Sequence, residues 1–298
     1  MDINLLKEKL KNGEIVVLDG ATGSELTARG VKTDLPLWSA EALLTHPEVV
    51  KQIHKDYLDA GAQIITTNTF RTNARTFEKK NLTKDQAKKA TILACKLVKE
   101  AIEESGKQAW VMGEIAPLED CYTPSLVPPL PELQKEHLEN AEFLKMGGVD
   151  FIAAETMIDI KETVAACDAI QKVGLPLAVS FCCNEKGQLL SGESIEEAVA
   201  AIDKFDPLFI SLNCMNLKTI TKVLPILRKA TNLPIGAYAQ GDGQVDDKDG
   251  WVGGGPEAVD EYIEEVKKWI GIGAQVIGGC CGTNPQYIKE LVKLNTKS

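Results

Sequence analysis

Eight short apolar runs recur along the chain, and they constrain its fold more than any other feature of the sequence. Each run is mainly apolar and has the length of a strand buried on both faces, as in parallel sheets. We therefore predict eight parallel strands. They cover residues 15–18, 63–67, 109–112, 149–154, 175–181, 208–212, 233–238 and 274–277.

Segments with the periodicity of an α-helix separate these runs. The clearest spans residues 83–105, where apolar residues recur every three or four positions and Thr83 followed by Gln86 has the pattern of a capping box. Pro225 falls inside the helical pattern 217–230, and we expect it to break or kink that helix. Three further helix starts are predicted at Asp159 with Glu162, at Ser194 with Glu197, and at Asn284 before Pro285.

The alternation of strand and helix predicts the architecture. Eight such units within 298 residues fit a single α/β domain, a (β/α)8 TIM barrel over residues 1–298, and no linker divides the chain. An open, doubly wound sheet is the alternative, because alternation alone does not reveal closure. The connections 20–46 and 240–255 follow strands and are longer than ordinary loops, so we expect them to form lids on the catalytic face.

Charge and hydropathy argue against two classes of partner. Forty-three acidic against 33 basic residues give a net charge of −10 without a basic block, which argues against binding nucleic acid. No segment has the long apolar run of a membrane span, and the N-terminus lacks an apolar leader. We therefore predict a cytoplasmic protein that does not enter membranes. The pattern does not predict the oligomeric state.

Acids, amides and thiols follow the predicted strands. Because the carboxyl ends of all barrel strands meet at one rim, we expect these side chains to converge there and to form an active site. The residues in question are Asp19, Asn68, Glu114, Glu155, Cys182, Cys183, Asn213, Cys214, Gln240, Asp242, Cys280 and Cys281.

Three of these thiols form the sharpest pattern. Cys214, Cys280 and Cys281 can take three corners of a tetrahedron around zinc, which leaves the fourth corner open for chemistry. Thiolates are soft ligands and favour zinc over harder cations. The spacing itself is not a standard zinc motif, so ordinary core thiols and a redox pair remain alternatives.

Three segments at these positions resemble the homocysteine S-methyltransferases: residues 19–23, Asn213 with Cys214, and residues 278–282 with their glycine-flanked double cysteine. The resemblance runs from about Ile15 to Leu291. It implies a barrel in which Cys214, Cys280 and Cys281 hold Zn²⁺ and a methyl group moves onto the sulfur of homocysteine, forming methionine.

The same resemblance implies how the substrates are held. It assigns the amino-acid end of homocysteine to Asp19 and Glu155, with backbone N–H groups around Ala21 and Thr22 facing its carboxylate. Trp38 lies in a segment similar to the lid of stand-alone enzymes that use S-methylmethionine, and its ring suits a cationic donor. Asn68 lies in a segment similar to the homocysteine module of cobalamin-dependent methionine synthases, whose further modules do not fit in this chain, and we expect it to contact substrate.

Several alternatives stay open at this point. Betaine is the second candidate donor, and a non-catalytic zinc-binding barrel or a thiol-redox protein is the alternative to a methyltransferase. The family usually has Tyr-x-Asn after the seventh strand, whereas this chain has Gln240 in place of the asparagine, which affects the expected donor contact. Cys182 and Cys183 lie outside the family pattern and are expected to pack in the core, as are Cys95 and Cys167 in helices; Cys121 is unassigned.

Overall fold

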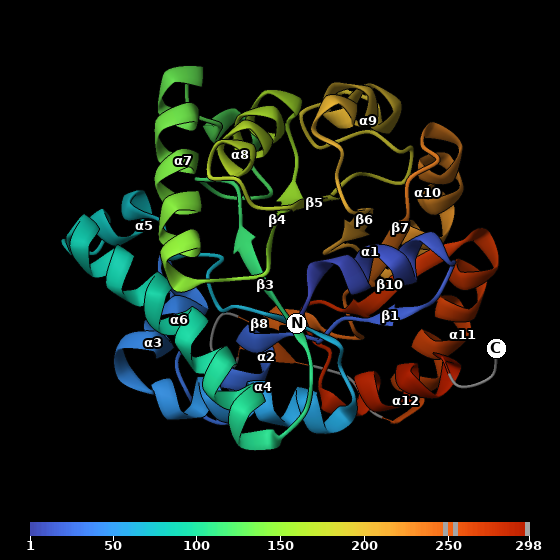
Figure 1. Cartoon of the computed structure of the whole chain (residues 1–298), viewed down its shortest axis with the longest axis horizontal. Helices are drawn as coiled ribbons and strands as arrows, with labels where there is room; N and C mark the ends of the chain where they lie inside the picture. Colours follow the sequence, from blue (N-terminus) through green and yellow to red (C-terminus); the bar gives the residue numbers. More distant parts are fainter. Residues whose placement is uncertain (247–249, 253–255, 296–298) are drawn as a thin grey trace.

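An eight-stranded parallel sheet forms the centre of the computed structural model, which describes residues 1–246, 250–252 and 256–295 (Figure 1). Neighbouring strands follow the order β1-β10-β7-β6-β5-β4-β3-β2. The two outer strands also meet, because Leu18 pairs with Ile64 and the Asp19 N–H donates to the Ile64 carbonyl over 3.1 Å. The sheet is thus closed into a barrel, which rules out the open alternative. The strands are β1 (Val16–Val17), β2 (Ile64–Thr66), β3 (Trp110–Ile115), β4 (Phe151–Met157), β5 (Leu177–Phe181), β6 (Ile210–Asn213), β7 (Ile235–Ala239) and β10 (Ala274–Gly279).

Helices surround the barrel (Figure 1). All eight predicted strands are confirmed, with boundaries shifted by a few residues. The α-helices are α1 (Ile3–Lys11), α2 (Thr22–Ala28), α3 (Glu41–Thr45), α4 (Pro47–Ala60), α5 (Ala74–Glu78), α6 (Lys84–Ser105), α7 (Leu130–Gly147), α8 (Ile160–Lys172), α9 (Ile195–Ile202), α10 (Leu217–Ala230), α11 (Pro256–Ile272) and α12 (Pro285–Asn295). The 3₁₀ helices are η1 (Trp38–Ala40), η2 (Pro124–Leu126) and η3 (Asp203–Phe205).

The predicted helix starts are confirmed by their capping contacts. Thr83 and Gln86 form a complete capping box at the start of α6, and Ser194 with Glu197 forms another at α9. The Asp159 side chain caps α8, and α12 begins at Pro285. These local bonds satisfy N–H groups that the first helical turn leaves without partners.

Helix α10 differs from the expectation, because it continues through Pro225 without a break. Its core-facing side is fully buried at Ile220, Val223, Leu224 and Leu227. Burial of this apolar face compensates for the hydrogen bond that proline cannot make.

Side chains alternate along the strands between two apolar layers. Those at Trp110, Met112 and Phe151 belong to a cluster inside the barrel, whereas Val111 and Ile152 pack outward against the helices. Helix α1 fills the amino-terminal end of the barrel: its residues Leu6 and Leu10 join the interior cluster, and the Trp110 indole N–H donates to the Asp2 carbonyl over 3.0 Å. The polar strand ends therefore lie at the opposite, carboxyl-terminal end.

The two long connections contain structure of their own. Residues 20–46 form α2, η1 and α3. Residues 240–255 include an antiparallel hairpin of β8 (Gln244–Asp246) and β9 (Gly250–Val252), and the rest of that segment, 247–249 and 253–255, lies outside the described residues. A closing motion of either connection stays a prediction. No helix among the described residues is both long and apolar enough to cross a membrane.

Candidate functional site

The three predicted thiols lie together at the carboxyl end of the barrel. Cys214 follows β6, and Cys280 and Cys281 follow β10. The Sγ atoms of Cys214 and Cys280 are 2.7 Å apart, and all three sulfurs lie within 4.8 Å of one another. Residues 66 positions apart in the sequence thus meet at one point.

The sulfur cluster fits a tetrahedral metal ion. Zinc–sulfur bonds of about 2.3 Å place the sulfurs of a tetrahedral site roughly 3.8 Å apart, which is within the spread of this cluster. Within the described part of the chain, it is the one group of three or more cysteine, histidine or acidic side chains with ligand atoms this close. Hydrogen bonds from Cys214 and Cys280 hold the pKa of Cys281 well below its usual value, whereas the pKa values of Cys214 and Cys280 are raised. Within the cluster the Cys281 sulfur is therefore the one stabilised as a thiolate.

Backbone hydrogen bonds fix the chain segments that carry the thiols. The Cys280 N–H donates to the Ala239 carbonyl over 2.8 Å, and the Gly241 N–H donates to the Cys281 carbonyl over 2.8 Å, which ties the end of β10 to β7. Gly279 allows the turn that carries both cysteines to fold back on itself, because a Cβ there would lie 2.2 Å from the Thr283 hydroxyl oxygen. Cys214 has a φ of 54°, which is unusual for a residue other than glycine and is a form of strain found at functional sites.

Asp19 and Glu155 lie buried beside this cluster. The Asp19 carboxylate accepts hydrogen bonds of 2.8 Å from the N–H and the hydroxyl of Thr66, yet burial raises its pKa to about 7. Burial and the nearby Cys214 raise the pKa of Glu155 to about 8. Its Oε1 accepts from the Asn213 amide at 3.2 Å, whereas its Oε2 is buried and has no partner. Oε2 of Glu155 is therefore available to accept a hydrogen bond from a bound ligand.

Asn213 connects the acid to the thiols. Its Oδ1 accepts from the Ser180 hydroxyl at 2.7 Å, and its Nδ2 donates to both Glu155 and the Thr156 hydroxyl, the latter at 2.8 Å. The residue that precedes Cys214 is thereby locked in one orientation. The sequence reasoning used Asn213 only as part of a motif and missed this function.

Glu114 is a third buried acid that the sequence reasoning placed at the rim without giving it a role. It follows Trp110 and Met112 along the inward face of β3 and is 9% exposed. Burial, together with the charges of Glu155 and Asp19, raises its pKa well above the ordinary value. An acid at the end of a buried run was the available signal; Glu155 has the same signal, but it was assigned through the family resemblance.

The loop after β3 brings a tyrosine to the thiols, which no motif predicted. The Tyr122 hydroxyl is close enough to Cys214 to act on its thiol as a hydrogen-bond donor, which lowers a pKa that remains raised overall, and the residue is 50% exposed. An Asx-type turn holds the loop locally, because the Tyr122 N–H donates to the Asp120 carboxylate over 2.8 Å. Tyr122 thus covers the cluster from the solvent side.

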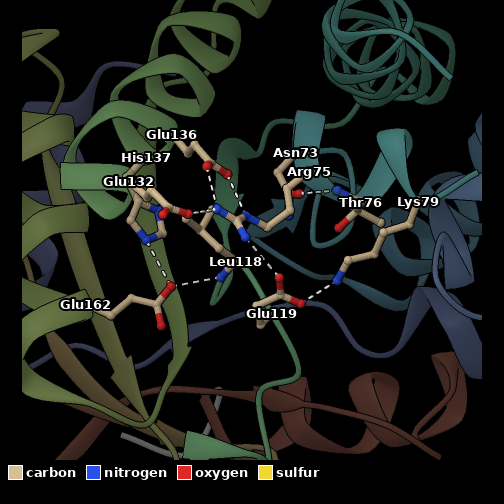
Figure 2. Close-up of polar contacts among 10 residues, drawn as sticks. All are labelled: Asn73, Arg75, Thr76, Lys79, Leu118, Glu119, Glu132, Glu136, His137 and Glu162. Atoms are coloured by element: carbon tan, nitrogen blue, oxygen red, sulfur yellow. Dashed lines mark hydrogen bonds and ion pairs between the residues drawn. The ribbon is translucent and has the colours of Figure 1, made fainter. Parts of the chain in front are cut away.

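Figure 2 shows how the start of this loop is anchored to two helices. The Leu118 N–H donates to the Glu162 carboxylate of α8 over 2.8 Å, and His137 of α7 contacts the same oxygen at 3.2 Å. Both His137 and Glu162 are almost fully buried. The neighbouring Glu119 pairs with Arg75 of α5 at 3.2 Å, and Arg75 also binds two glutamates of α7. These contacts fix the loop from its buried and its exposed side.

The remaining predicted site residues lie on the first long connection. The N–H of Ala21 donates to the Thr283 hydroxyl at 3.3 Å, and Thr22 begins α2, whose N-cap side chain makes no capping bond. The Trp38 ring packs on Gly23, where a Cβ would lie 2.4 Å from it, and contacts Phe70 edge to face with ring centroids 5.9 Å apart. Contact of Ala21, Thr22 and Trp38 with substrate stays a prediction.

Asn68 has a partner within the protein. Its side-chain amide donates to the Ser39 carbonyl at 2.9 Å and so fastens the first connection to the end of β2. A contact between Asn68 and substrate also stays a prediction.

The other cysteines are buried. The Cys183 sulfur contacts the Met215 sulfur at 3.6 Å, and the Cys182 sulfur lies 3.9 Å from the Cys214 carbonyl. Burial raises the pKa of Cys183, Cys95, Cys167 and Cys121 to about 12. These thiols are therefore protonated and poorly nucleophilic at neutral pH.

Comparison with known proteins agrees with this geometry. A family model described as homocysteine S-methyltransferase matches residues 16–294. The chain is 28% identical to homocysteine S-methyltransferase 2 of Zea mays, over 96% of this chain and 91% of that protein. It is 26% identical to selenocysteine Se-methyltransferase of Brassica oleracea var. italica, over 97% and 91%. The metallated form of the homocysteine methyltransferase MmuM from Escherichia coli superposes with a TM-score of 0.84 at 26% identity, covering 98% of this chain and 99% of MmuM.

Proposed function

Because this chain belongs to the homocysteine S-methyltransferase family and is a methyltransferase, we propose that it moves a methyl group from S-methylmethionine to the sulfur of homocysteine. The observation that carries the proposal is the meeting of three thiols with a buried carboxylate that has one unpartnered oxygen. The thiols suit a metal that activates a sulfur nucleophile, and the acid suits the ammonium of an amino acid.

We assign Zn²⁺ to Cys214, Cys280 and Cys281. Bound zinc lowers the pKa of a coordinating thiol and so supplies a thiolate at neutral pH. Three protein ligands are the number typical of a catalytic zinc site, in which one position stays available to substrate. The soft sulfur set favours zinc over magnesium or calcium.

Asp19 and Glu155 hold the amino-acid end of homocysteine in this proposal. The unpartnered Oε2 of Glu155 accepts a hydrogen bond from the substrate ammonium, which satisfies a buried group that otherwise costs free energy. Thr66 keeps the Asp19 carboxylate in place through two hydrogen bonds. The substrate carboxylate faces Ala21 and Thr22 at the start of α2, where the positive end of the helix dipole favours it.

The methyl donor lies under the first connection. Trp38 and Phe70 offer aromatic faces and edges to a sulfonium, and a cation near an aromatic face is stabilised by about 0.5–2 kcal/mol. The homocysteine sulfur forms a bond to the methyl carbon as the sulfonium carbon–sulfur bond breaks. Each substrate becomes methionine, and the thiol proton of homocysteine leaves to solvent. Asn68 supports the reaction by fixing the connection that carries Trp38.

Parallel assays test this proposal. Purified protein is incubated with homocysteine and, in separate reactions, S-methylmethionine, betaine or dimethylsulfoniopropionate, and methionine is quantified together with bound metal. We expect about one zinc per chain and the fastest turnover with S-methylmethionine. The Cys214→Ser variant loses both metal and turnover, whereas Cys167→Ala, which removes a buried thiol in α8, keeps both.

Each outcome has a distinct meaning. Faster turnover with betaine overturns the donor assignment alone. Zinc retention without product from any donor overturns the catalytic proposal and favours a metal-binding barrel. Full zinc content in Cys214→Ser overturns the ligand assignment.

A further inference from the structure

Glu114 has no task in the reaction outlined above, although its side chain faces the same end of the barrel interior. It pairs in register with Ala153 on β4, and Glu155 comes two residues later on that strand. Because side chains alternate along a strand, both acids point toward the barrel interior. Trp110 and Met112, four and two residues before Glu114, belong to the interior apolar cluster. Glu114 therefore lies directly above this apolar layer.

The acids at this end of the barrel lack a positive partner. In the described part of the chain, no lysine, arginine or histidine forms an ion pair with Asp19, Glu114 or Glu155. The carboxylate of Glu114 accepts from the backbone N–H of Thr69, and Glu155 keeps one buried oxygen without any partner. Placing three carboxylates together in a buried site is costly unless ligands bring positive charge.

One cation does not account for three acids. Homocysteine carries a single ammonium, which the proposed function assigns to Asp19 and Glu155. The methyl donors under consideration carry a permanent positive charge on sulfur or nitrogen that cannot be removed by loss of a proton. Glu114, the third acid, can balance the permanent positive charge of the methyl donor, which is the second cation.

The position of Glu114 also favours the donor. Its backbone N–H donates to the Thr69 hydroxyl at 3.2 Å, and its carbonyl accepts from the same hydroxyl at 2.8 Å. The next residue along the chain from Thr69 is Phe70, whose ring contacts Trp38. The backbone of Glu114 is thus held against the segment that carries Phe70, whereas the Glu155 side chain contacts Asn213, the residue before Cys214.

We propose that Glu114 is a specificity-determining residue that recognises the permanent positive charge of the methyl donor. This inference rests on the proposed function and extends it to the choice between charged and uncharged donors. Because a sulfonium has no N–H or O–H to donate, the interaction is coulombic, and a charge is required at position 114 rather than a hydrogen-bonding amide.

A matched pair of ligands tests the charge requirement directly. S-Methylmethionine and 2-amino-5-methylhexanoic acid have nearly the same shape, but the second has a carbon in place of the charged sulfur. Calorimetric titration of the zinc-loaded protein measures the affinity for each. We expect wild type to prefer the sulfonium and Glu114→Gln to lose about tenfold or more of that affinity while its affinity for the carbon analogue is unchanged.

Kinetics with two variants separate the two cation sites. Glu114→Gln is expected to raise KM for S-methylmethionine while the dissociation constant of homocysteine changes less than about twofold, whereas Glu155→Gln has the opposite pattern. Glu114→Asp, which keeps the charge, retains part of the preference for the sulfonium and provides a second test if the glutamine variant does not fold.

Equal sulfonium affinity in wild type and Glu114→Gln overturns the inference, because it indicates that a neutral carboxylic acid suffices at this position. Equal loss of affinity for both ligands overturns it as well, because a packing defect, or a contact of Glu114 with the ammonium that both ligands carry, produces that result. Zinc-loaded wild-type protein that yields no methionine from any donor refutes the proposed function instead, and the two failures are therefore distinguishable.

Discussion

The side-chain amide of Asn213 donates to Glu155 over 3.2 Å, so the residue that precedes Cys214, a proposed metal ligand, also orients the acid that we propose to bind substrate. A second donation to Thr156 and an acceptance from Ser180 leave the Asn213 amide no freedom to rotate. One side chain thus contacts both the proposed amino-acid subsite and the segment that carries the proposed metal site. A change at Asn213 is expected to act on both.

Replacing Asn213 tests this connection. Asn213→Leu leaves Oε1 of Glu155 without the amide donor, and an unsatisfied buried acceptor costs about 1–3 kcal/mol. We expect homocysteine to bind about tenfold more weakly, as measured by calorimetry, with a smaller change in bound zinc. The exposed Asn184→Ala variant is the control. Unchanged homocysteine affinity in Asn213→Leu contradicts the proposed orientation of Glu155.

Metal removal is expected to expose the thiol cluster. Dialysis against a strong chelator should abolish methionine formation and increase the number of thiols that react with a chromogenic disulfide, because zinc shields its ligands. Re-addition of one equivalent of zinc restores activity. The buried thiols, with a pKa of about 12 at Cys95 and Cys167, stay unreactive in both forms. Equal thiol counts before and after chelation argue against a metal at Cys214, Cys280 and Cys281.

A buried histidine makes stability depend on pH. Both ring nitrogens of His54 on α4 are buried without partners, and burial lowers its pKa from 6.5 to about 4. Below pH 6.5 the unfolded chain binds a proton that the folded chain does not bind until about pH 4, so stability falls as the pH is lowered across this window. The loss amounts to about 3 kcal/mol.

Denaturation in urea at pH 7, 6 and 5 measures this effect. The free energy of unfolding of wild type is compared with that of His54→Leu, because other buried groups titrate in both proteins and cancel in the difference. We expect the leucine variant to lose less stability toward acid, and exposed His46→Gln to behave as wild type. Parallel curves for wild type and His54→Leu would show that His54 titrates normally.

Glu162 is expected to matter more for the loop after β3 than for α8 itself. Glu162→Leu leaves the Leu118 N–H and His137 without their shared acceptor (Figure 2), which costs about 2–4 kcal/mol of unfolding free energy. Glu162→Gln keeps an oxygen in place and costs less. Chemical denaturation measures both, and limited proteolysis reports on residues 118–123. Equal stability of the two variants contradicts this role.

The sequence predicts the barrel well because its strands are buried on both faces and stand out as apolar runs. It also predicts the thiol cluster, since Cys214 and Cys280 each follow a strand and all strand ends share one rim. It does not reveal Tyr122, whose loop conformation depends on distant anchors at Glu162 and Arg75. Glu114 points into the barrel because β3 continues to Ile115 with alternating side chains. The predicted strand ended at residue 112 and therefore gave no direction for the Glu114 side chain.

Helix α1 and its contact with Trp110 close the amino-terminal end of the barrel, and the candidate site lies at the other end. One end therefore contributes to stability and the other to substrate binding. We expect that the amino-terminal end can be repacked around Leu6 and Leu10 to raise the melting temperature without changing substrate specificity at the carboxyl-terminal end. Conversely, stabilising substitutions around Leu6 and Leu10 can offset the free energy of unfolding that substitutions at the carboxyl-terminal end of the barrel cost. An engineer can therefore improve robustness first and then broaden the range of accepted methyl compounds.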